Sequence, residues 1–329
     1  MRGLTKLAPG PGNVALAERP EPSAAPGHVV LEVAGAGICG TDLHIADDEF
    51  PSVPPVTMGH EVSGVVAELG EGVDGAWAGA RVVTETYFST CADCGFCREG
   101  RPNLCAQRRS IGSYVDGGFA PFLHVPAHNL HRIPEWVDAH AAALTEPLAC
   151  CCHSLLDPPR VGAGDEVLVV GPGPVGLLAS QVARALGGRV HVRGTPRDEA
   201  RLAVARDLGF EVSTTDDGPV EADVVVECSG SAAGISFGLE SARRGGRYVQ
   251  IGLAGKPVTL PFDLVCYREL TVSSGNASTP ASWLRAVELV ETRRVALEPL
   301  LSEVVPLEDW ERAFAATRAG AAIKVVLAP

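Results

Sequence analysis

Four cysteines stand close together in the stretch CADCGFCREGRPNLC, with the spacing C-x2-C-x2-C-x7-C. They are Cys91, Cys94, Cys97 and Cys105. Four thiolates at such spacing can complete a tetrahedron around Zn²⁺ and leave no position open for a substrate. An iron–sulfur cluster uses the same ligands, and disulfides or free thiols are further alternatives. Because the loop is polar and charged, and electron transfer has no other support in the sequence, the spacing favours a structural zinc site.

A second group of possible metal ligands lies upstream, in GICGTDLH (Cys39, His44) and in GHE (His60, Glu61). Taken singly, such a cysteine is more often a buried thiol and such a histidine a surface imidazole. Their grouping around glycines and turn-forming residues favours a second metal site.

The glycines Gly171, Gly173 and Gly176 form G-x-G-x-x-G directly after an apolar run and before a helical stretch. In that context glycines permit a tight turn and the close approach of a dinucleotide pyrophosphate to a helix N-terminus. The motif therefore predicts a dinucleotide-binding site.

Two different patterns of secondary structure follow one another along the chain. Up to about residue 150 the sequence predicts short strands between Gly/Pro turns, as in a small barrel or sandwich, at 28–37, 61–70, 80–87 and 119–127. From Asp165 the alternation of strands and helices predicts a doubly wound parallel sheet, with strands at 166–170, 189–192, 222–228, 247–252 and 270–275 and helices at 175–187, 197–209 and 233–246. Beyond it we expect a helix at 280–294, a short strand, a helix at 307–320 and a last strand at 323–328. We place the domain boundaries near residues 153 and 275.

Composition limits the class of protein. A length of 329 residues suggests about two domains, and a net charge of −13 argues against nucleic acid or an anionic membrane as partner. The first residues lack the apolar core of a signal peptide, and the most apolar stretch is too short and too broken to span a bilayer. Ten cysteines then suggest thiols or metal ligands in a reducing, cytoplasmic location.

Five motifs occur in the order found in the zinc-dependent medium-chain alcohol dehydrogenases, and the whole chain resembles that family. They are GICGTDLH, GHEVSGVVAELGEGV, the four-cysteine loop, LTEPLACCCH and VLVVGPGPVGLLA. The similarity is greatest to the polyol (sorbitol-like) and threonine dehydrogenase branch. It implies an α/β protein with a GroES-like β-rich catalytic domain at 1–153 and 276–329 and a Rossmann domain at 154–275.

The resemblance also implies the ligands of a catalytic zinc. Cys39 and His60 are the firm ligands, and Glu61 is an exchangeable or water-mediated one. Glu146 stands where other branches have a cysteine and where this branch has a glutamate that binds zinc or its water. Which glutamate is the direct ligand stays open. Asp42 resembles the carboxylate that orients the histidine, as metal-bound histidines usually require.

Proton transfer and cofactor binding follow from the same resemblance. Thr41 takes the proton of the substrate hydroxyl and His44 passes it to solvent. The residues implied at the dinucleotide are Gly171, Gly173, Pro174, Val175, Gly176, Ser229, Gly230, Ile251, Gly252 and, near the pyrophosphate, Lys324.

The choice between NAD and NADP depends on the end of the second strand, where an NAD-selective site needs an acidic side chain. No carboxylate stands there; Asp198 comes a few residues later, where helix capping explains it. Thr195 and Arg197 could bind a 2′-phosphate. We therefore expect NADP to be accepted at least as well as NAD.

The function expected from these features is hydride transfer between a small secondary alcohol or polyol and NAD(P), with two zinc ions per chain. The alternatives are a threonine-dehydrogenase-like or aminocyclitol dehydrogenase and, from another class, a zinc-ribbon module that senses a nucleotide without turnover. The resemblance further implies a homo-tetramer or homo-dimer formed through the strand at 270–275.

Overall fold

The structure of the chain is a computed structural model that describes residues 1–320 and 322–329. It divides into two compact units, one of Met1–Glu146 with Leu301–Pro329 and one of Pro147–Leu300. The boundaries expected near 153 and 275 both fall inside the second unit. One reason is that the Gln181 side chain exchanges two hydrogen bonds with the backbone of Ala296, which ties the segment after residue 275 to the second unit.

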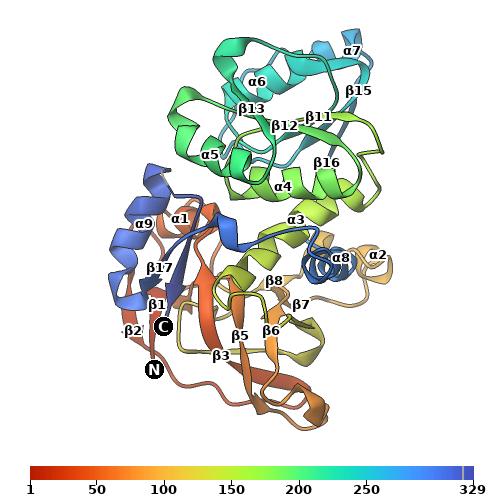
Figure 1. Cartoon of the computed structure of the whole chain (residues 1–329). Coiled ribbons are helices and arrows are strands. Elements are labelled where there is room, and N and C mark those ends of the chain that lie inside the picture. The colour runs from red at the N-terminus through yellow and green to blue at the C-terminus, as the bar shows by residue number, and fades with distance from the viewer. Residues whose placement is uncertain (321) are drawn as a thin grey trace. The chain divides into compact units, whose positions relative to one another are not determined.

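The first unit is rich in strands, as the sequence predicts (Figure 1). A seven-stranded sheet has the order β10-β6-β5-β3-β18-β17 with β9 also on β3, a three-stranded sheet has the order β2-β1-β4, and β7 pairs with β8. The strands are β1 (Arg2–Lys6), β2 (Val14–Glu18), β3 (His28–Gly37), β4 (Val56–Thr57), β5 (Glu61–Leu69), β6 (Arg81–Thr84), β7 (Tyr87–Ser89), β8 (Arg109–Ser110), β9 (Phe122–Pro126), β10 (Leu130–Arg132), β17 (Leu301–Pro306) and β18 (Lys324–Ala328). The helices are α1 (Gly40–Ala46), α2 (Gly95–Arg98), α9 (Trp310–Ala319) and the start of α3 (Thr145–Leu156).

Strand β3 is the centre of this unit, because β5, β9 and β18 all pair with it in antiparallel fashion. Its apolar residues Leu31 and Ala36 are completely buried. The strands predicted at 28–37, 61–70 and 119–127 are confirmed, whereas the stretch 80–87 forms two strands, β6 and β7. Helix α1 was not predicted, because it is only about two turns long and too short for a clear helical period.

The second unit contains one parallel sheet of the order β13-β12-β11-β14-β15-β16, which confirms the doubly wound expectation. Its strands are β11 (Glu166–Val170), β12 (Arg189–Gly194), β13 (Glu211–Thr214), β14 (Ala222–Glu227), β15 (Ala242–Gln250) and β16 (Thr271–Ser274). Its helices are α4 (Pro174–Ala185), α5 (Glu199–Asp207), α6 (Ala232–Ser241), α7 (Leu264–Tyr267) and α8 (Pro280–Glu291).

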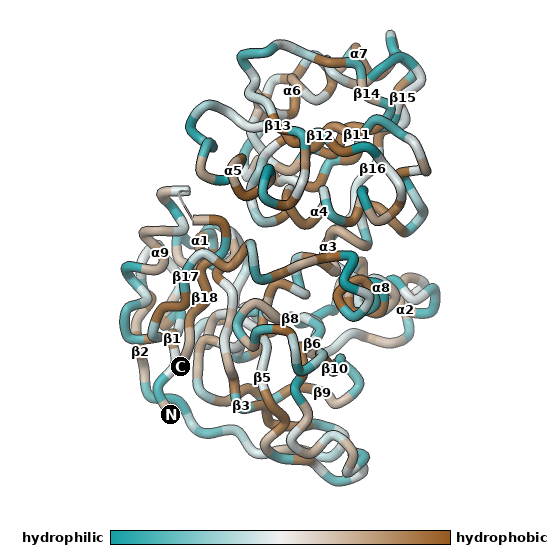
Figure 2. The backbone as a smooth tube through the Cα atoms, in the orientation of Figure 1, coloured by the Kyte–Doolittle hydropathy of each residue, from teal (hydrophilic) through white to brown (hydrophobic). Residues whose placement is uncertain are grey.

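The core of this sheet is apolar on both faces, as helices on either side of a parallel sheet require. Val167 to Val170 of β11 and Val224 to Val226 of β14 are buried. Figure 2 shows hydrophobic residues running through β11. Strand β13 was not predicted, because its four residues are mostly polar and half-buried at the edge of the sheet.

Within the described part of the chain, no helix combines the length and the apolar character needed to cross a bilayer.

A cluster of aromatic rings in the first unit contains two histidines. His28 and His124 stack with ring centroids 4.8 Å apart, and Phe88 lies 5.6 Å from each. The Nε2 atom of His124 is buried without a hydrogen-bond partner among the described residues. Burial, together with the charge of nearby His28, lowers the pKa of His124 despite the opposing charge of Glu68.

The free energy of unfolding should therefore fall as pH drops through about 6.5, the ordinary histidine pKa, because the unfolded chain then binds a proton that the folded one refuses. His124→Phe keeps an aromatic ring but cannot be protonated, so it should reduce this pH dependence. The exposed His128 offers the control His128→Phe, which should leave the dependence unchanged. Denaturant titrations between pH 5.5 and 8 would measure the free energy of unfolding at each pH. The same dependence of this free energy on pH in wild type and in His124→Phe would contradict the prediction.

Candidate functional site

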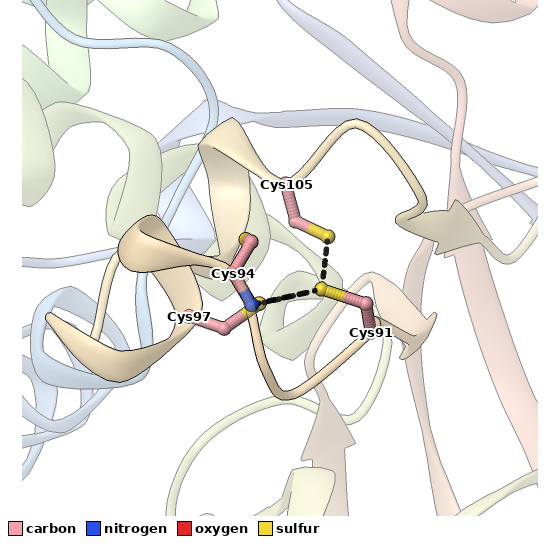
Figure 3. Close-up of side chains that lie close together, drawn as sticks. All are labelled: Cys91, Cys94, Cys97 and Cys105. Atoms are coloured by element: carbon pink, nitrogen blue, oxygen red, sulfur yellow. Dashed lines mark hydrogen bonds between the residues drawn. The ribbon is translucent and has the colours of Figure 1, made fainter.

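The four cysteine sulfurs converge in the loop between β7 and β8 (Figure 3). The Sγ atom of Cys91 lies 3.5 Å from that of Cys105 and 3.8 Å from that of Cys97. Sulfurs bound to one tetrahedral Zn²⁺ at about 2.3 Å lie about 3.8 Å apart, whereas a disulfide needs about 2.05 Å. The separations therefore fit four ligands of a single ion rather than pairs of disulfides.

The loop backbone also favours thiolate ligands. Backbone N–H groups of Asp93 and Cys94 donate toward Cys91 and lower the pKa of its thiol to about 6. Burial raises the pKa of Cys97 to about 11, so that sulfur becomes a good ligand only when a cation compensates its charge.

A second group of ligand atoms forms in the same unit from Cys39, His60 and Glu61, whose sulfur, nitrogen and carboxylate oxygen all lie within 4.8 Å of one another. Cys39 is the N-cap of α1, and His60 and Glu61 stand where β5 begins. A sulfur, an imidazole nitrogen and a carboxylate oxygen are ligands that zinc accepts, and three of them leave a position open. The donor set thus fits a catalytic rather than a structural ion.

Asp42 orients two of these ligands. It is completely buried, and its Oδ2 atom accepts a hydrogen bond from the backbone nitrogen of Cys39 at 2.9 Å. Its Oδ1 atom lies 3.5 Å from Nδ1 of His60. Burial alone would lower the pKa of His60, but the charge and hydrogen bonding of Asp42, with help from Cys39, hold it well above its usual value. The imidazole therefore lies in a negative local potential, which also favours a bound dication.

Glu61 is paired with Lys324. Both carboxylate oxygens lie 2.7 Å from the Lys324 ammonium, which also donates to the backbone oxygen of Ile38 at 3.0 Å. Burial would lower the pKa of Lys324, but the charges of Glu61 and Cys39 raise it. Its ammonium is thus committed beside the metal ligands, and the contact with a pyrophosphate expected for Lys324 stays a prediction.

Glu146 lies at the start of α3, and its Oε1 atom accepts a hydrogen bond from the Thr86 hydroxyl at 3.1 Å. Burial raises the pKa of Glu146, and the charge of Glu61 adds to the rise against the opposing effects of His60 and Thr86. Because the charges of His60 and Glu61 act on Glu146, its carboxyl group lies near these metal ligands. Glu146 is not one of the three residues whose ligand atoms lie within 4.8 Å of one another.

The two residues expected to carry the proton lie on α1. The Thr41 hydroxyl is 3.7 Å from the Cys39 sulfur, whereas the His44 side chain is half-exposed. The Nδ1 atom of His44 lies 2.7 Å from Oε2 of Glu49, a residue that was not predicted to belong to the site. Because a carboxylate accepts, Nδ1 donates and Nε2 is left as the nitrogen that exchanges protons.

The glycine motif lies in the second unit between β11 and α4, as predicted. Gly171 adopts φ +98°, and a Cβ there would come within 2.8 Å of the Ser229 backbone nitrogen. Gly173 is the N-cap of α4, Pro174 is its first residue, and the backbone oxygen of Val175 accepts a hydrogen bond from the Cys151 thiol. A Cβ at Gly176 would overlap the Gly171 carbonyl oxygen. The turn is therefore closed to larger residues and leaves the start of α4 open to a phosphate.

A cavity of about 350 Å³ adjoins this turn. Of the residues predicted to bind cofactor, Gly171, Thr195 and Ser229 line it. The remaining lining residues include Arg193, Gly194, Asp198, Thr215, Phe237 and Glu240. Arg193 is 2% exposed and stacks its guanidinium 5.2 Å from the ring centre of Phe237.

Thr195 and Arg197, which were expected to bind a 2′-phosphate, do not both face the cavity with a free polar group. The Thr195 hydroxyl donates to Asp198 at 2.7 Å, and Asp198 also accepts from the Thr195 backbone nitrogen. This capping interaction is the role foreseen for Asp198. Arg197 is exposed and does not belong to the cavity lining, whereas Arg193 does.

Comparison with known proteins identifies the family. Residues 25–135 match the alcohol dehydrogenase GroES-like domain, and residues 174–292 match the zinc-binding dehydrogenase family. A sorbitol dehydrogenase of Halalkalibacterium halodurans is 38% identical, with the alignment covering 100% of this chain and 99% of that protein. An L-threonine 3-dehydrogenase of Bacillus velezensis is 34% identical over 95% of each chain.

A solved structure of a Sinorhizobium meliloti protein bound to NADP superimposes with a TM-score of 0.90 at 32% identity, covering 100% of this chain and 99% of that one. The fold, the two groups of metal ligands and the glycine turn thus define a zinc-dependent dehydrogenase with an NAD(P) cofactor. The chain belongs to the zinc-dependent medium-chain alcohol dehydrogenases.

Metal analysis separates the two metal sites. Cys39→Ser should lower the zinc content from about two ions per chain to about one with little change in stability, because only the open site loses a ligand. Cys97→Ser should also remove about one zinc but should lower the unfolding temperature markedly, because a structural zinc contributes folding free energy. Elemental analysis with thermal unfolding measures both. A Cys97→Ser protein as stable as wild type would contradict the structural assignment.

Proposed function

We propose that the protein oxidises a small secondary alcohol or polyol with NAD(P), or reduces the corresponding ketone. The observation that carries the proposal is the open set of Cys39, His60 and Glu61 with Glu146 beside it. The 38% identity to a sorbitol dehydrogenase supports the substrate class.

Each side chain of the site has a defined task. Cys39, His60 and one of the two glutamates hold Zn²⁺, which when bound lowers the pKa of the substrate hydroxyl. Asp42 fixes the orientation of the His60 ring, and the Lys324 ammonium partly neutralises the negative charge of the Glu61 carboxylate. Thr41 accepts the proton from the substrate oxygen, and Nε2 of His44 passes it to solvent, while Glu49 holds Nδ1 of the same ring as a donor.

A threonine-type amino alcohol is the second candidate, favoured by the 34% identity to L-threonine 3-dehydrogenase. Initial rates with polyols, sugars, aminocyclitols and threonine, each with NAD and NADP, discriminate between the two. Turnover of polyols with little activity toward threonine is expected. No turnover of any alcohol by protein that holds both zinc ions would refute the proposal and favour the nucleotide-sensing module instead.

We further propose a homo-tetramer or homo-dimer in the reducing cytoplasm. Strand β16 lies at the edge of the parallel sheet, and Val272 on it and Tyr267 of α7 are exposed by 43% and 72%. An uncovered edge strand with apolar side chains supports pairing with a second copy. Light scattering that gives a monomer at micromolar concentration would contradict this.

His44→Ala should lower the rate of alcohol oxidation by about ten- to a hundredfold at low pH, where proton release limits, and less at high pH, where hydroxide takes the proton. Glu49→Gln should shift the same pH profile, because the amide lacks the negative charge beside Nδ1 and can present either its oxygen or its NH₂ group to that nitrogen. The pH dependence of kcat measures both. A loss that is the same at every pH would instead indicate damage to α1.

The finer proposal on the cofactor is that NADP is accepted at least as well as NAD. Arg193 lines the cavity, and the charge of Asp198 there is reduced by the Thr195 hydroxyl and by Arg201, whose Nη1 lies 3.7 Å from Oδ1. We propose that the exposed Arg197 pairs with the 2′-phosphate.

Arg197→Ala should then raise KM for NADP by about tenfold and leave KM for NAD nearly unchanged, since one charge-assisted hydrogen bond is lost. Arg206→Ala is a matched control, because Arg206 is an exposed arginine of α5 already paired with Glu199. Equal effects of Arg197→Ala on both cofactors, or a wild-type preference for NAD above about tenfold, would overturn the proposal.

A further inference from the structure

Glu227, the last residue of β14, has no assigned role and is completely buried, with 0% of its surface exposed. Its Oε1 atom accepts from the Ser229 backbone nitrogen at 2.8 Å and from the Ser229 hydroxyl. Its Oε2 atom accepts from the Gly230 backbone nitrogen at 3.1 Å and from the Gln250 amide at 2.7 Å. A buried carboxylate is costly unless donors satisfy it, and here four do.

The main chain of Glu227 binds a second loop. Its carbonyl oxygen accepts from the backbone nitrogens of Ile251 at 2.8 Å and Gly252 at 2.9 Å. The Gln250 amide nitrogen, besides contacting Glu227, donates to the Gly252 carbonyl at 2.7 Å. One residue therefore joins the loop after β14 to the loop after β15.

The orientation of the Gln250 amide is itself fixed. The Tyr248 hydroxyl donates to Oε1 of Gln250 at 2.9 Å, which leaves Nε2 for Glu227. Burial, with the charge of Glu227, raises the pKa of Tyr248, so this hydroxyl keeps its proton. Each of the four groups that contact the Glu227 carboxylate is thus a donor. If an amide replaced this carboxylate, its NH₂ group would face one of these donors without an acceptor between them.

The two joined loops fit closely. A Cβ on Gly252 would overlap the Gly230 backbone nitrogen and come within 2.8 Å of Oε2 of Glu227. The first loop also contributes Ser229 to the wall of the cavity beside the glycine turn. A small change at Glu227 therefore displaces backbone that borders the cavity.

We propose that Glu227 is a positioning residue for cofactor binding, because its carboxylate holds Ser229 and Gly230 in register with Ile251 and Gly252. The inference rests on the proposed assignment of these four residues to the nicotinamide. Glu227 itself touches no cofactor; it fixes the backbone that does.

The test measures the binding of NADH and NADPH to zinc-loaded protein by fluorescence titration. Glu227→Gln, of nearly equal size, should raise Kd for both cofactors by roughly ten- to a hundredfold, because a buried donor loses its acceptor. The zinc content, set by the other unit, should stay unchanged. At saturating cofactor, KM for the alcohol should also stay within about twofold of wild type.

Asp223→Asn is the matched control, because Asp223 lies on the same strand and also accepts from a backbone nitrogen and an arginine. It removes a carboxylate charge from the same strand at a partly exposed position, and cofactor binding should stay within about twofold of wild type. Wild-type affinity in Glu227→Gln, or equal losses in Glu227→Gln and Asp223→Asn, would overturn the proposal.

Gln250→Leu provides a second variant should Glu227→Gln not fold. It removes one donor from the carboxylate and one hydrogen bond to the Gly252 carbonyl. It should raise Kd for both cofactors by roughly five- to thirtyfold, which corresponds to about 1 to 2 kcal/mol at 1.4 kcal/mol per tenfold. Unchanged Kd in this variant would overturn the proposal. Because the titration measures binding alone, failure of wild type to oxidise any alcohol would refute the proposed function and not this inference.

Discussion

The ion pair between Glu61 and Lys324 joins two segments of the chain that are far apart in sequence, since Glu61 begins β5 and Lys324 begins the last strand, β18. Taking two charges out of water costs several kcal/mol per ion, and only close, well-satisfied partners offset it. Both carboxylate oxygens lie 2.7 Å from the ammonium, and Ile38, beside Cys39, accepts its third hydrogen bond. The metal ligands thus depend on the return of residues 301–329 to the first unit.

The same constraint, that buried charge needs donors or a cation, shapes the rest of the metal site. The Oδ2 atom of Asp42 accepts a hydrogen bond from the Cys39 backbone nitrogen, and its Oδ1 atom faces His60. Glu146 accepts a hydrogen bond from the Thr86 hydroxyl. In the other unit, Glu227 is satisfied by four donors from two loops. In both units a buried carboxylate holds neighbouring backbone in place. In the first unit a cysteine and a histidine lie beside Glu61 as further metal ligands, whereas in the second unit only uncharged donors surround Glu227.

The large features of the fold could be predicted because they depend on local pattern. The apolar runs of β11 and β14 are intrinsically suited to a sheet buried on both faces, and the glycine turn between β11 and α4 follows from steric limits within six residues. The two-turn helix α1, the edge strand β13 and the extent of the second unit could not be predicted, because their stability comes from packing rather than from their own sequence.

The sequence by itself determined the grouping of the four cysteines and the glycine turn, because thiolates at close spacing and glycines in a tight turn act within one segment. Only the tertiary structure decided how these residues are held. Lys324 lies beside Glu61, the Thr195 hydroxyl is used by Asp198, Glu49 reaches His44, and Glu227 links two loops. Charged and hydrogen-bonding side chains find partners wherever the folded chain brings them within about 3 Å, and no spacing in the sequence specifies those distances.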